Sequence, residues 1–290
     1  MATIRTGPRT WKKVRVYLGK GLTGKQRAKL REQKRPELEG LVRAAQRRAD
    51  PFSALLTEGQ ERALERAKRR KGPVDALQRR NWYESFVAEF TYDTNAIEGS
   101  TLSLSETASL LFEGIVPAGK RVREVREAEN HKEAFDYLLG HRGEVTTTLV
   151  LRVHKLLMHD ILWKEAGGFR EVDVWIRGAE FIPPRHGEVR EEFRKLMEWY
   201  RTARRRYHPI VVAAVFHGWF EAVHPFRDGN GRTGRLLMNF MLRKAGYPMA
   251  NIKYKDRAAY YAALRARTHG EYKPLVDLIV RYVTEEERVL

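Results

Sequence analysis

Along most of the chain, apolar residues recur every three or four positions, which is the spacing of one face of an α-helix. This pattern predicts helices over residues 23–33, 37–48, 57–71, 74–99, 103–114, 123–142, 146–162, 190–205, 211–223 and 236–242. Thr23 precedes the first helix as an N-cap, and Ser103 with Glu106 forms a capping-box pattern. The fold class that follows is mainly α.

Two segments depart from the helical spacing. Residues 10–19 alternate weakly and contain β-formers, so we expect a short strand there. Residues 167–189 read as a β-hairpin or extended flap. The features that mark this flap are Gly167, Gly168, Gly178, Pro183, Pro184 and the alternating Val172, Val174 and Ile176. Such a flap can bind a partner segment by strand addition, or it can be a plain loop that covers the core.

The length of 290 residues, 42% of them hydrophobic, allows one large or two modest domains. We expect a basic N-terminal segment over residues 1–80 and a second domain over residues 81–290. The absence of cysteine excludes disulfides and thiolate metal sites. The first residues lack the apolar run of a signal peptide, and no window reaches the length of a membrane span. We therefore expect a soluble, cytoplasmic protein with no membrane partner.

Positive charge is concentrated in residues 1–80, which hold 23 Lys and Arg residues against 8 Asp and Glu residues. This segment therefore carries +15 of the formal net charge of +18. A basic segment can bind nucleic acid or another polyanion. It can equally be a set of solvated helices, and we favour that interpretation because no nucleic-acid motif accompanies the charge.

The stretch HPFRDGNGRTGR, residues 224–235, interrupts two apolar helical segments with glycines, arginines, an acid and a histidine. Its glycines let backbone N–H groups close on an anion, and a helix that begins near Asn230 or Gly231 adds a positive dipole end. Arg232 and Arg235 lie three residues apart on one face of that helix, where forked guanidinium groups suit phosphate oxygens.

Two further side chains of this stretch can take part in catalysis, one as a metal ligand and one as a proton acceptor. Asp228 is a hard oxygen ligand that can hold Mg²⁺ bridging phosphates. His224 is the residue of this loop that can accept a proton near neutral pH. The alternative is an ordinary Gly/Asn turn whose arginines pair with surface acids, and the full set argues against it. Histidines in apolar helices, such as His154 and His217, are more often core residues than ligands.

Residues 224–235 match H-P-F-x-D-G-N-G-R-x-x-R in full and resemble the signature of Fic domains. The resemblance covers roughly residues 85–285. It implies a Fic-type helical bundle with a β-hairpin flap, preceded here by the basic N-terminal extension. It also implies transfer of AMP from ATP to a hydroxyl of a target protein.

The resemblance implies a role for each residue of the loop. His224 takes the proton of a Tyr, Ser or Thr hydroxyl, and Asp228 holds Mg²⁺ against the phosphates. Gly229, Asn230, Gly231 and Arg232 hold the triphosphate, and Arg235 reaches the γ-phosphate. The flap, about residues 167–189, aligns the target backbone. Asn239 lines the adenine pocket, as Tyr260 or Tyr261 could, although helix packing explains each of them equally well.

A second motif lies earlier in the chain. TNAIEG, residues 94–99, resembles the inhibitory motif [S/T]-x-x-x-E-[G/N] of the same family. The resemblance implies an inhibitory helix at about residues 85–99, in which Glu98 pairs with Arg235 and displaces the γ-phosphate. The alternative is that Glu98 caps a helix or forms an ordinary ion pair.

Other functions stay open at this point. Glu98 can orient a water so that the enzyme removes AMP, or the site can transfer another nucleotide. A non-enzymatic alternative is a nucleic-acid-binding protein, in which the basic N-terminal segment binds the nucleic acid and the Fic domain regulates this binding. We do not favour nucleic acid as a partner. By analogy with the family, a homodimer is a further expectation.

Overall fold

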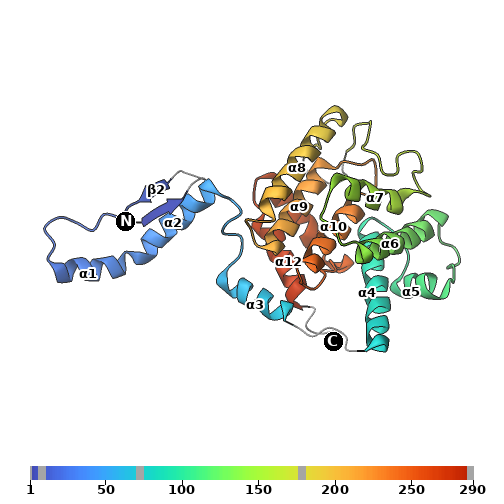
Figure 1. Cartoon of the computed structure of the whole chain (residues 1–290), viewed down its shortest axis with the longest axis horizontal. Coiled ribbons are helices and arrows are strands. Elements are labelled where there is room, and N and C mark those ends of the chain that lie inside the picture. Colours follow the sequence, from blue (N-terminus) through green and yellow to red (C-terminus); the bar gives the residue numbers. More distant parts are fainter. Residues whose placement is uncertain (1, 6–10, 70–74, 176–180, 286–290) are drawn as a thin grey trace. The chain divides into compact units, whose positions relative to one another are not determined.

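The computed structural model describes residues 2–5, 11–69, 75–175 and 181–285 of the chain. These residues divide into two compact units, Met1–Thr57 and Glu58–Leu290. The predicted boundary at residue 80 falls within a helix of the second unit, α4 (Ala76–Ile97). Mainly helical structure confirms the predicted fold class (Figure 1).

Among its described residues, the first unit contains two strands and two helices. Strands β1 (Ala2–Arg5) and β2 (Trp11–Val14) pair antiparallel, with Ala2 opposite Val14. The strand predicted at residues 10–19 is therefore present as β2. Helix α1 (Gly24–Gln33) follows, and Thr23 caps it through a capping box with Gln26, as the sequence predicted. Helix α2 (Arg35–Ala49) completes the unit.

The second unit is a helical bundle. Its elements are α3 (Glu58–Lys68), α4 (Ala76–Ile97), α5 (Leu104–Glu113), α6 (Val122–Gly140), α7 (Thr147–Met158), η1 (His186–Glu188), α8 (Val189–Ala203), α9 (Pro209–Val223), α10 (Asn230–Lys244), η2 (Tyr254–Asp256), α11 (Arg257–Thr268) and α12 (Lys273–Glu285). Ser103 and Glu106 form the predicted capping box of α5. Gly114 ends that helix in the left-handed conformation, which a glycine adopts without strain.

Helices α9 and α10 form the centre of the bundle, because both are buried almost around their whole circumference. Helix α9 packs against α8, α10, α11 and α12, while α10 also packs against α4, α6 and α7 (Figure 1). The loop between these two helices, residues 224–229, is therefore held by the core of the unit on both sides.

The C-terminal half of α4 is buried, and contacts with neighbouring segments hold it in place near its middle and near its C-terminus. Near its middle, the ring of Phe90 lies 5.6 Å from that of Phe86 and 6.0 Å from that of Phe135 on α6. Nearer the C-terminus, the buried carboxylate of Asp93 accepts hydrogen bonds of 2.8 Å from Asn251 Nδ2 and from the Tyr254 N–H. The C-terminal end of α4, which carries Glu98, is thus positioned by α6 and by the segment before α11.

The flap between α7 and α8 contains no β-strand in its described parts, residues 167–175 and 181–189. Its central residues 176–180, which include Ile176 and Gly178, lie outside the described residues. The described limbs are extended chain and turns, and the second limb ends in η1. They carry exposed apolar side chains, among them Val172, Trp175 and Ile182.

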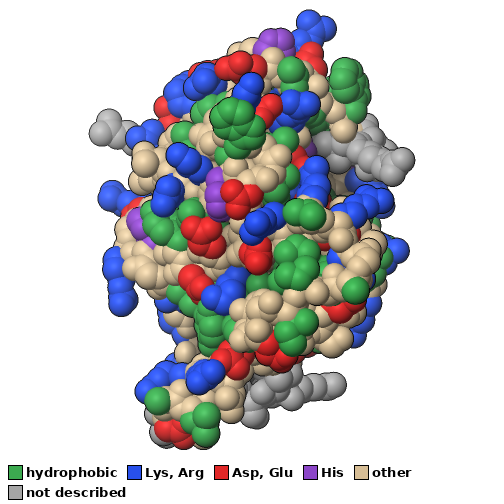
Figure 2. Space-filling model, turned by 90° about the vertical axis from the view of Figure 1, so that its right-hand side faces the viewer, with side chains coloured by type: hydrophobic (Ala, Val, Ile, Leu, Met, Phe, Trp, Pro, Cys, Tyr) green, Lys and Arg blue, Asp and Glu red, His purple; other side chains and the backbone are tan. Residues whose placement is uncertain are grey.

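No helix among the described residues is long and apolar enough to cross a membrane. On the face of the molecule in Figure 2, acidic, basic and apolar side chains are interspersed. The second unit holds 40 of the 55 Lys and Arg residues and 33 of the 37 Asp and Glu residues, so its formal net charge is +7.

Candidate active site

The loop of residues 224–229 has an unusual backbone at both ends. His224 ends α9 in the left-handed conformation, with φ of 47°, and Gly229 precedes α10 with φ of 75°. A Cβ atom at Gly229 would lie 2.9 Å from Met158 Sδ, so only glycine fits there. The Asn230 side chain closes the loop on itself, because its Oδ1 accepts from the Phe226 N–H at 2.9 Å and its Nδ2 donates to the Phe226 carbonyl at 2.8 Å.

The imidazole of His224 is oriented by its own helix. Its Nδ1 lies 3.2 Å from the carbonyl oxygen of Glu221, and a carbonyl can only accept, so Nδ1 carries the proton. The Nε2 lone pair is therefore available to accept a proton. Burial lowers the pKa of His224 to about 4, which keeps the ring neutral at physiological pH.

Arg170 ties the flap to this histidine. Its buried guanidinium donates from Nε to the His224 carbonyl at 2.8 Å, from Nη1 to the Val172 carbonyl at 3.0 Å, and from Nη2 to the Pro184 carbonyl at 2.5 Å. Both limbs of the flap and the left-handed residue His224 are thus joined by one side chain. A lysine ammonium also has three donors, but all of them lie on one nitrogen, so the wider planar fork of arginine suits three separate carbonyl groups better.

Asp228 is held in the loop by three groups. Its Oδ1 accepts from the Gly229 N–H at 2.6 Å and from Arg232 at 3.3 Å, while its Oδ2 pairs with Arg123 of α6. Burial raises the pKa of Asp228, but Arg232, the Gly229 N–H and Arg123 outweigh burial, so the pKa lies below its ordinary value. The carboxyl group is therefore ionised at neutral pH.

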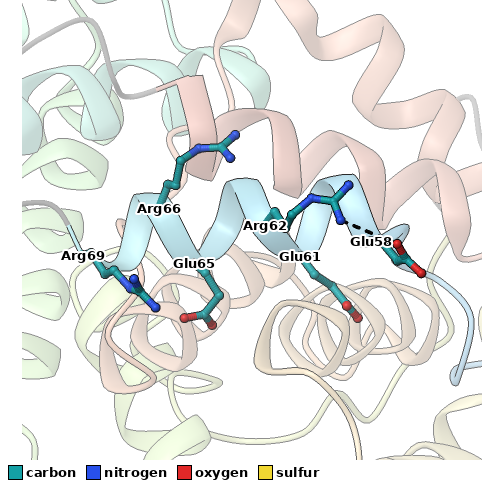
Figure 3. Close-up of a pocket in the computed structure, with 6 residues that line it drawn as sticks. All are labelled: Glu58, Glu61, Arg62, Glu65, Arg66 and Arg69. Atoms are coloured by element: carbon teal, nitrogen blue, oxygen red, sulfur yellow. Dashed lines mark ion pairs between the residues drawn. The ribbon is translucent and has the colours of Figure 1, made fainter.

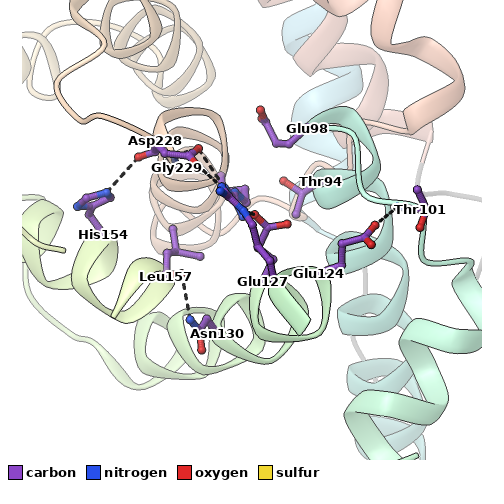
Figure 4. A network of polar contacts seen from close by, with 12 residues as sticks. Thr94, Glu98, Thr101, Glu124, Glu127, Asn130, His154, Leu157, Asp228 and Gly229 are labelled. Atoms are coloured by element: carbon purple, nitrogen blue, oxygen red, sulfur yellow. Dashed lines mark hydrogen bonds and ion pairs between the residues drawn. The ribbon is translucent and has the colours of Figure 1, made fainter. Parts of the chain in front are cut away.

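His154 of α7 supports the backbone of the same loop (Figure 4). The Gly167 N–H donates to its Nδ1 at 3.0 Å, so the ring proton is on Nε2, which lies 3.1 Å from the Asp228 carbonyl oxygen. The ring also stacks on Phe226, with centroids 3.6 Å apart. His154 is thus a satisfied core histidine, as the sequence indicated, and it joins the flap to the Asp228 loop.

Arg235 is a fully buried guanidinium that contacts the end of α4. Its Nε donates to the Thr94 hydroxyl at 2.7 Å, and its Nη2 donates to the Thr94 carbonyl at 3.1 Å and to Glu98 Oε1 at 2.7 Å. Its Nη1 reaches the Tyr260 hydroxyl at 3.4 Å. The structure therefore brings together the pair of residues that the motif comparison implied, Glu98 and Arg235.

The Glu98 carboxylate also lies at the N-terminus of α10. A Cβ atom built on Gly231 would lie 2.2 Å from Glu98 Oε1, so a side chain there would exclude this carboxylate. Within the described residues, no side chain caps this helix. Its first N–H groups and the helix dipole therefore favour an anion at this place. In this structure the anion is Glu98.

Glu221 is a buried acid that interacts electrostatically with Arg235. Burial raises the pKa of Glu221 to about 8, and its Oε1 makes no hydrogen bond among the described residues. It lies 3.9 Å from Nδ1 of His217, whose Nε2 is 2.7 Å from the Tyr260 hydroxyl. Tyr260 therefore belongs to a buried polar chain next to Arg235.

The remaining residues that were predicted to contact the nucleotide make different hydrogen bonds in the structure. Asn239 is buried, and its amide bonds both backbone groups of Ala250, at 3.1 Å and 2.6 Å. These contacts fit the packing role, and its contact with adenine stays a prediction. The Tyr261 hydroxyl donates to the Ile97 carbonyl at 3.1 Å. Arg232 is buried, and its Nε makes no hydrogen bond among the described residues.

Asp228 offers a single carboxylate as a metal ligand, which suits a cation that takes few ligands from the protein. Among the described residues, no three His, Asp or Glu side chains form a metal-binding group. Mg²⁺ at nucleotide sites is commonly held by one or two carboxylates, phosphate oxygens and water. Asp228, an ionised carboxylate beside the anion site of α10, meets that requirement.

A separate hollow of about 540 Å³ lies along α3. Figure 3 shows its lining, which consists of charged side chains of that helix and of Arg69 just after it. Arg62 pairs with Glu58 at 3.5 Å. None of the loop residues 224–235 lines it. Its lining consists of charged side chains outside the 224–235 loop, so we place the candidate site at that loop.

The chain is similar in sequence and fold to known proteins. Residues 144–242 match the family model described as the Fic/DOC family. The protein adenylyltransferase Fic of Nematostella vectensis is 30% identical over 214 residues, 72% of this chain and 50% of that protein. The protein adenylyltransferase Fic of Drosophila ananassae is 32% identical over 244 residues, 81% of this chain and 48% of that protein.

A solved structure of a Fic-1 fragment from Caenorhabditis elegans is similar to this fold, with a TM-score of 0.70 and 26% identity, over 90% of this chain and 83% of that one. The chain contains a Fic domain and belongs to the Fic/DOC family. It spans about half the length of the curated relatives that it matches.

Sequence reasoning missed several residues around the loop. Arg170 was visible as the arginine of the GGFR stretch, but nothing in the sequence showed that it reaches His224. Arg123 and Glu127 lie on α6, about a hundred residues before the loop, and they looked like surface charges of an amphipathic helix. Glu221 looked like one polar residue in an apolar helix.

Buried neutral histidines make the stability of the protein sensitive to acid. Burial lowers the pKa of His131 and His217 to about 3 and that of His154 and His224 to about 4. Between these values and about pH 6.5, the unfolded chain binds more protons, so the free energy of unfolding falls as pH falls. The raised pKa values of Glu221 and Asp93 oppose this effect.

We therefore expect urea unfolding to give a lower free energy of unfolding at about pH 5 than at about pH 7. His154→Gln keeps a polar side chain at the loop but removes one titrating group, so its loss of stability with acid should be smaller. Equal stability of the wild-type chain at both pH values would show that these histidines are not held neutral.

Proposed function

We propose that the protein is an adenylyltransferase that transfers AMP from ATP to a Tyr, Ser or Thr hydroxyl of a target protein or of itself. The observation that carries this proposal is the arrangement of the 224–235 loop. It places a free imidazole nitrogen, an ionised carboxylate and an uncapped helix N-terminus together on one buried loop. Curated relatives named protein adenylyltransferase support it.

In the proposed reaction, Nε2 of His224 takes the proton of the target hydroxyl. The hydroxyl oxygen forms a bond to the α-phosphorus of ATP, the bond to the bridging oxygen breaks, and pyrophosphate leaves in line. Arg170 fixes His224 by its carbonyl, so it acts as a positioning residue. Phosphate charge beside the imidazole favours its protonated form and raises its pKa from the low value of the free site.

The phosphates would lie at the N-terminus of α10. The backbone N–H groups of the first turn and Arg232 would bind the triphosphate, and Arg235 would bind the γ-phosphate. The Asn230 side chain is occupied by Phe226, so Asn230 would contribute its backbone. Asp228 would hold Mg²⁺, which, when bound, neutralises the charge that develops on the phosphates.

The target protein would bind along the flap. Trp175 and Ile182 expose most of their apolar surface, and Arg170 joins the limbs that carry them to His224. A target segment that contacts this surface would bring its hydroxyl toward the histidine. Main-chain pairing with the flap would align the target independently of its side chains.

Glu98 would act as a brake on this reaction. Its carboxylate bonds Arg235 and lies at the helix N-terminus that the γ-phosphate needs. A carboxylate fixed in the fold has a high effective concentration there, so it competes with a ligand from solution. ATP that binds without Arg235 would be misaligned for in-line attack.

The first functional prediction concerns the base. In a Glu98→Gly background with ATP and Mg²⁺, intact-mass spectrometry should show addition of AMP to the protein or to an added target. His224→Ala should retain ATP binding and lower the transfer rate by about 10² to 10⁴-fold, because the phosphate site survives and the proton acceptor is lost. Transfer at an undiminished rate would refute the role of His224. Loss of AMP from a pre-modified target would instead indicate the reverse reaction.

The second functional prediction concerns the brake. Glu98→Gly and Glu98→Gln should raise the initial rate of AMP transfer by at least about tenfold, because Arg235 becomes free for the γ-phosphate. Glu84→Gln is the matched control: it neutralises another α4 carboxylate, which pairs with Arg80 at 2.8 Å. Arg235→Ala should be slow with or without Glu98. If both Glu98 variants transfer AMP no faster than the control, Glu98 is a structural residue.

A further inference from the structure

Asp228 is one corner of a closed ring of alternating charges. Glu127 Oε1 on α6 lies 2.9 Å from Arg123 Nε and 3.1 Å from Arg232 Nη1. Asp228 Oδ1 lies 3.3 Å from Arg232 Nη2, and Asp228 Oδ2 pairs with Arg123 Nη2. Figure 4 shows Glu127 on its helix facing the loop that carries Asp228. Two arginines thus bridge the same two carboxylates.

The two arginines differ in their exposure to solvent. The side chain of Arg232 is 2% exposed, whereas that of Arg123 is 52% exposed. Moving the buried guanidinium would leave uncompensated carboxylates, which is costly. Moving the exposed guanidinium costs little, because water replaces its contacts and an exposed ion pair contributes little stability. Arg232 is therefore a fixed member of the ring, and Arg123 is the member that can leave.

The two oxygens of Asp228 are not equivalent for a ligand. Oδ1 is held by Arg232 and by the Gly229 N–H at 2.6 Å, which are both parts of the loop and helix. Oδ2 pairs with Arg123 alone among the described residues. The side chain of Asp228 is 36% exposed, so this second oxygen can be reached from solvent once Arg123 moves.

We propose that Arg123 is a displaceable cation of the metal site: it holds Asp228 Oδ2 in the nucleotide-free protein and is exchanged for the divalent cation that enters with the nucleotide. This inference rests on the proposed function, because it takes Asp228 as the ligand of that cation. Arg123 keeps its Nε contact with Glu127 when Nη2 leaves Asp228. The exchange therefore needs a side-chain movement and no change of the helices.

The exchange makes Arg123 a competitor of the divalent cation. Removing its charge should raise the affinity of the site for the cation by about two- to fivefold, the range expected for an exposed ion pair. If Arg123 instead bound the phosphates, its removal would weaken binding of both the nucleotide and the cation. The two roles therefore predict changes of opposite sign.

The test measures metal binding and does not depend on turnover. Mn²⁺ would be titrated into the full chain carrying Glu98→Gly, in the presence of the α,β-methylene analogue of ATP, which cannot release pyrophosphate. Bound Mn²⁺ would be followed by electron paramagnetic resonance. The same titration would be made with Arg123→Gln. Arg126→Gln is the matched control, because Arg126 lies on the same helix, is 50% exposed and pairs with Glu129 at 2.9 Å.

We expect Arg123→Gln to lower the Mn²⁺ midpoint about two- to fivefold and Arg126→Gln to leave it nearly unchanged. An unchanged or raised midpoint with Arg123→Gln would overturn the proposal. Equal lowering by both variants would also overturn it, because a general loss of positive charge would then be the cause.

AMP transfer would be measured separately on the same proteins. Tighter Mn²⁺ binding in Arg123→Gln without any AMP transfer would support the metal exchange and count against the proposed enzyme activity. Transfer with an unchanged Mn²⁺ midpoint would support the activity and reject the exchange.

Discussion

The site depends on a buried cation that needs an anion. The guanidinium of Arg235 lies in the core beside the N-terminus of α10, where the helix dipole is also positive. Unpaired charge in such a place is costly, so some anion has to approach it. The chain supplies Glu98 from the end of α4, and Thr94 adds two neutral acceptors to the same guanidinium. The proposed phosphate site is thereby held by a carboxylate of the same chain.

The same constraint recurs on the other side of the loop. Asp228 is an ionised carboxylate, and Arg123 and Arg232 neutralise it. Both halves of the proposed nucleotide site thus contain stand-ins, Glu98 for a phosphate and Arg123 for a metal ion. Both come from helices N-terminal to the loop, α4 and α6. Binding of a metal–nucleotide complex would replace the Glu98–Arg235 ion pair with a contact between a phosphate and Arg235. It would likewise replace the Arg123–Asp228 ion pair with a contact between the metal ion and Asp228.

The sequence predicted what depends on local pattern. Helical spacing, the caps at Thr23 and Ser103, and the start of α10 at Asn230 follow from residues close together in the chain. The Glu98–Arg235 pair was implied by resemblance, and the structure confirms the contact. The link from Arg170 to His224 and the pairing of Arg123 with Asp228 could not be predicted, because each joins residues 54 or more positions apart. Asn230 illustrates the same limit. Its polar side chain suggested a contact with a ligand, but its amide closes the loop by bonding the backbone of Phe226.

The central claim is that one guanidinium is shared in turn by Glu98 and by a phosphate. Crystal structures of the wild-type chain and of Glu98→Gly, each with the α,β-methylene analogue of ATP, test it most directly. The account predicts the γ-phosphate on Arg235 and the α-phosphate facing His224 Nε2 in the variant, and a displaced triphosphate in the wild type. A γ-phosphate on Arg235 with Glu98 still bonded to it would contradict the account.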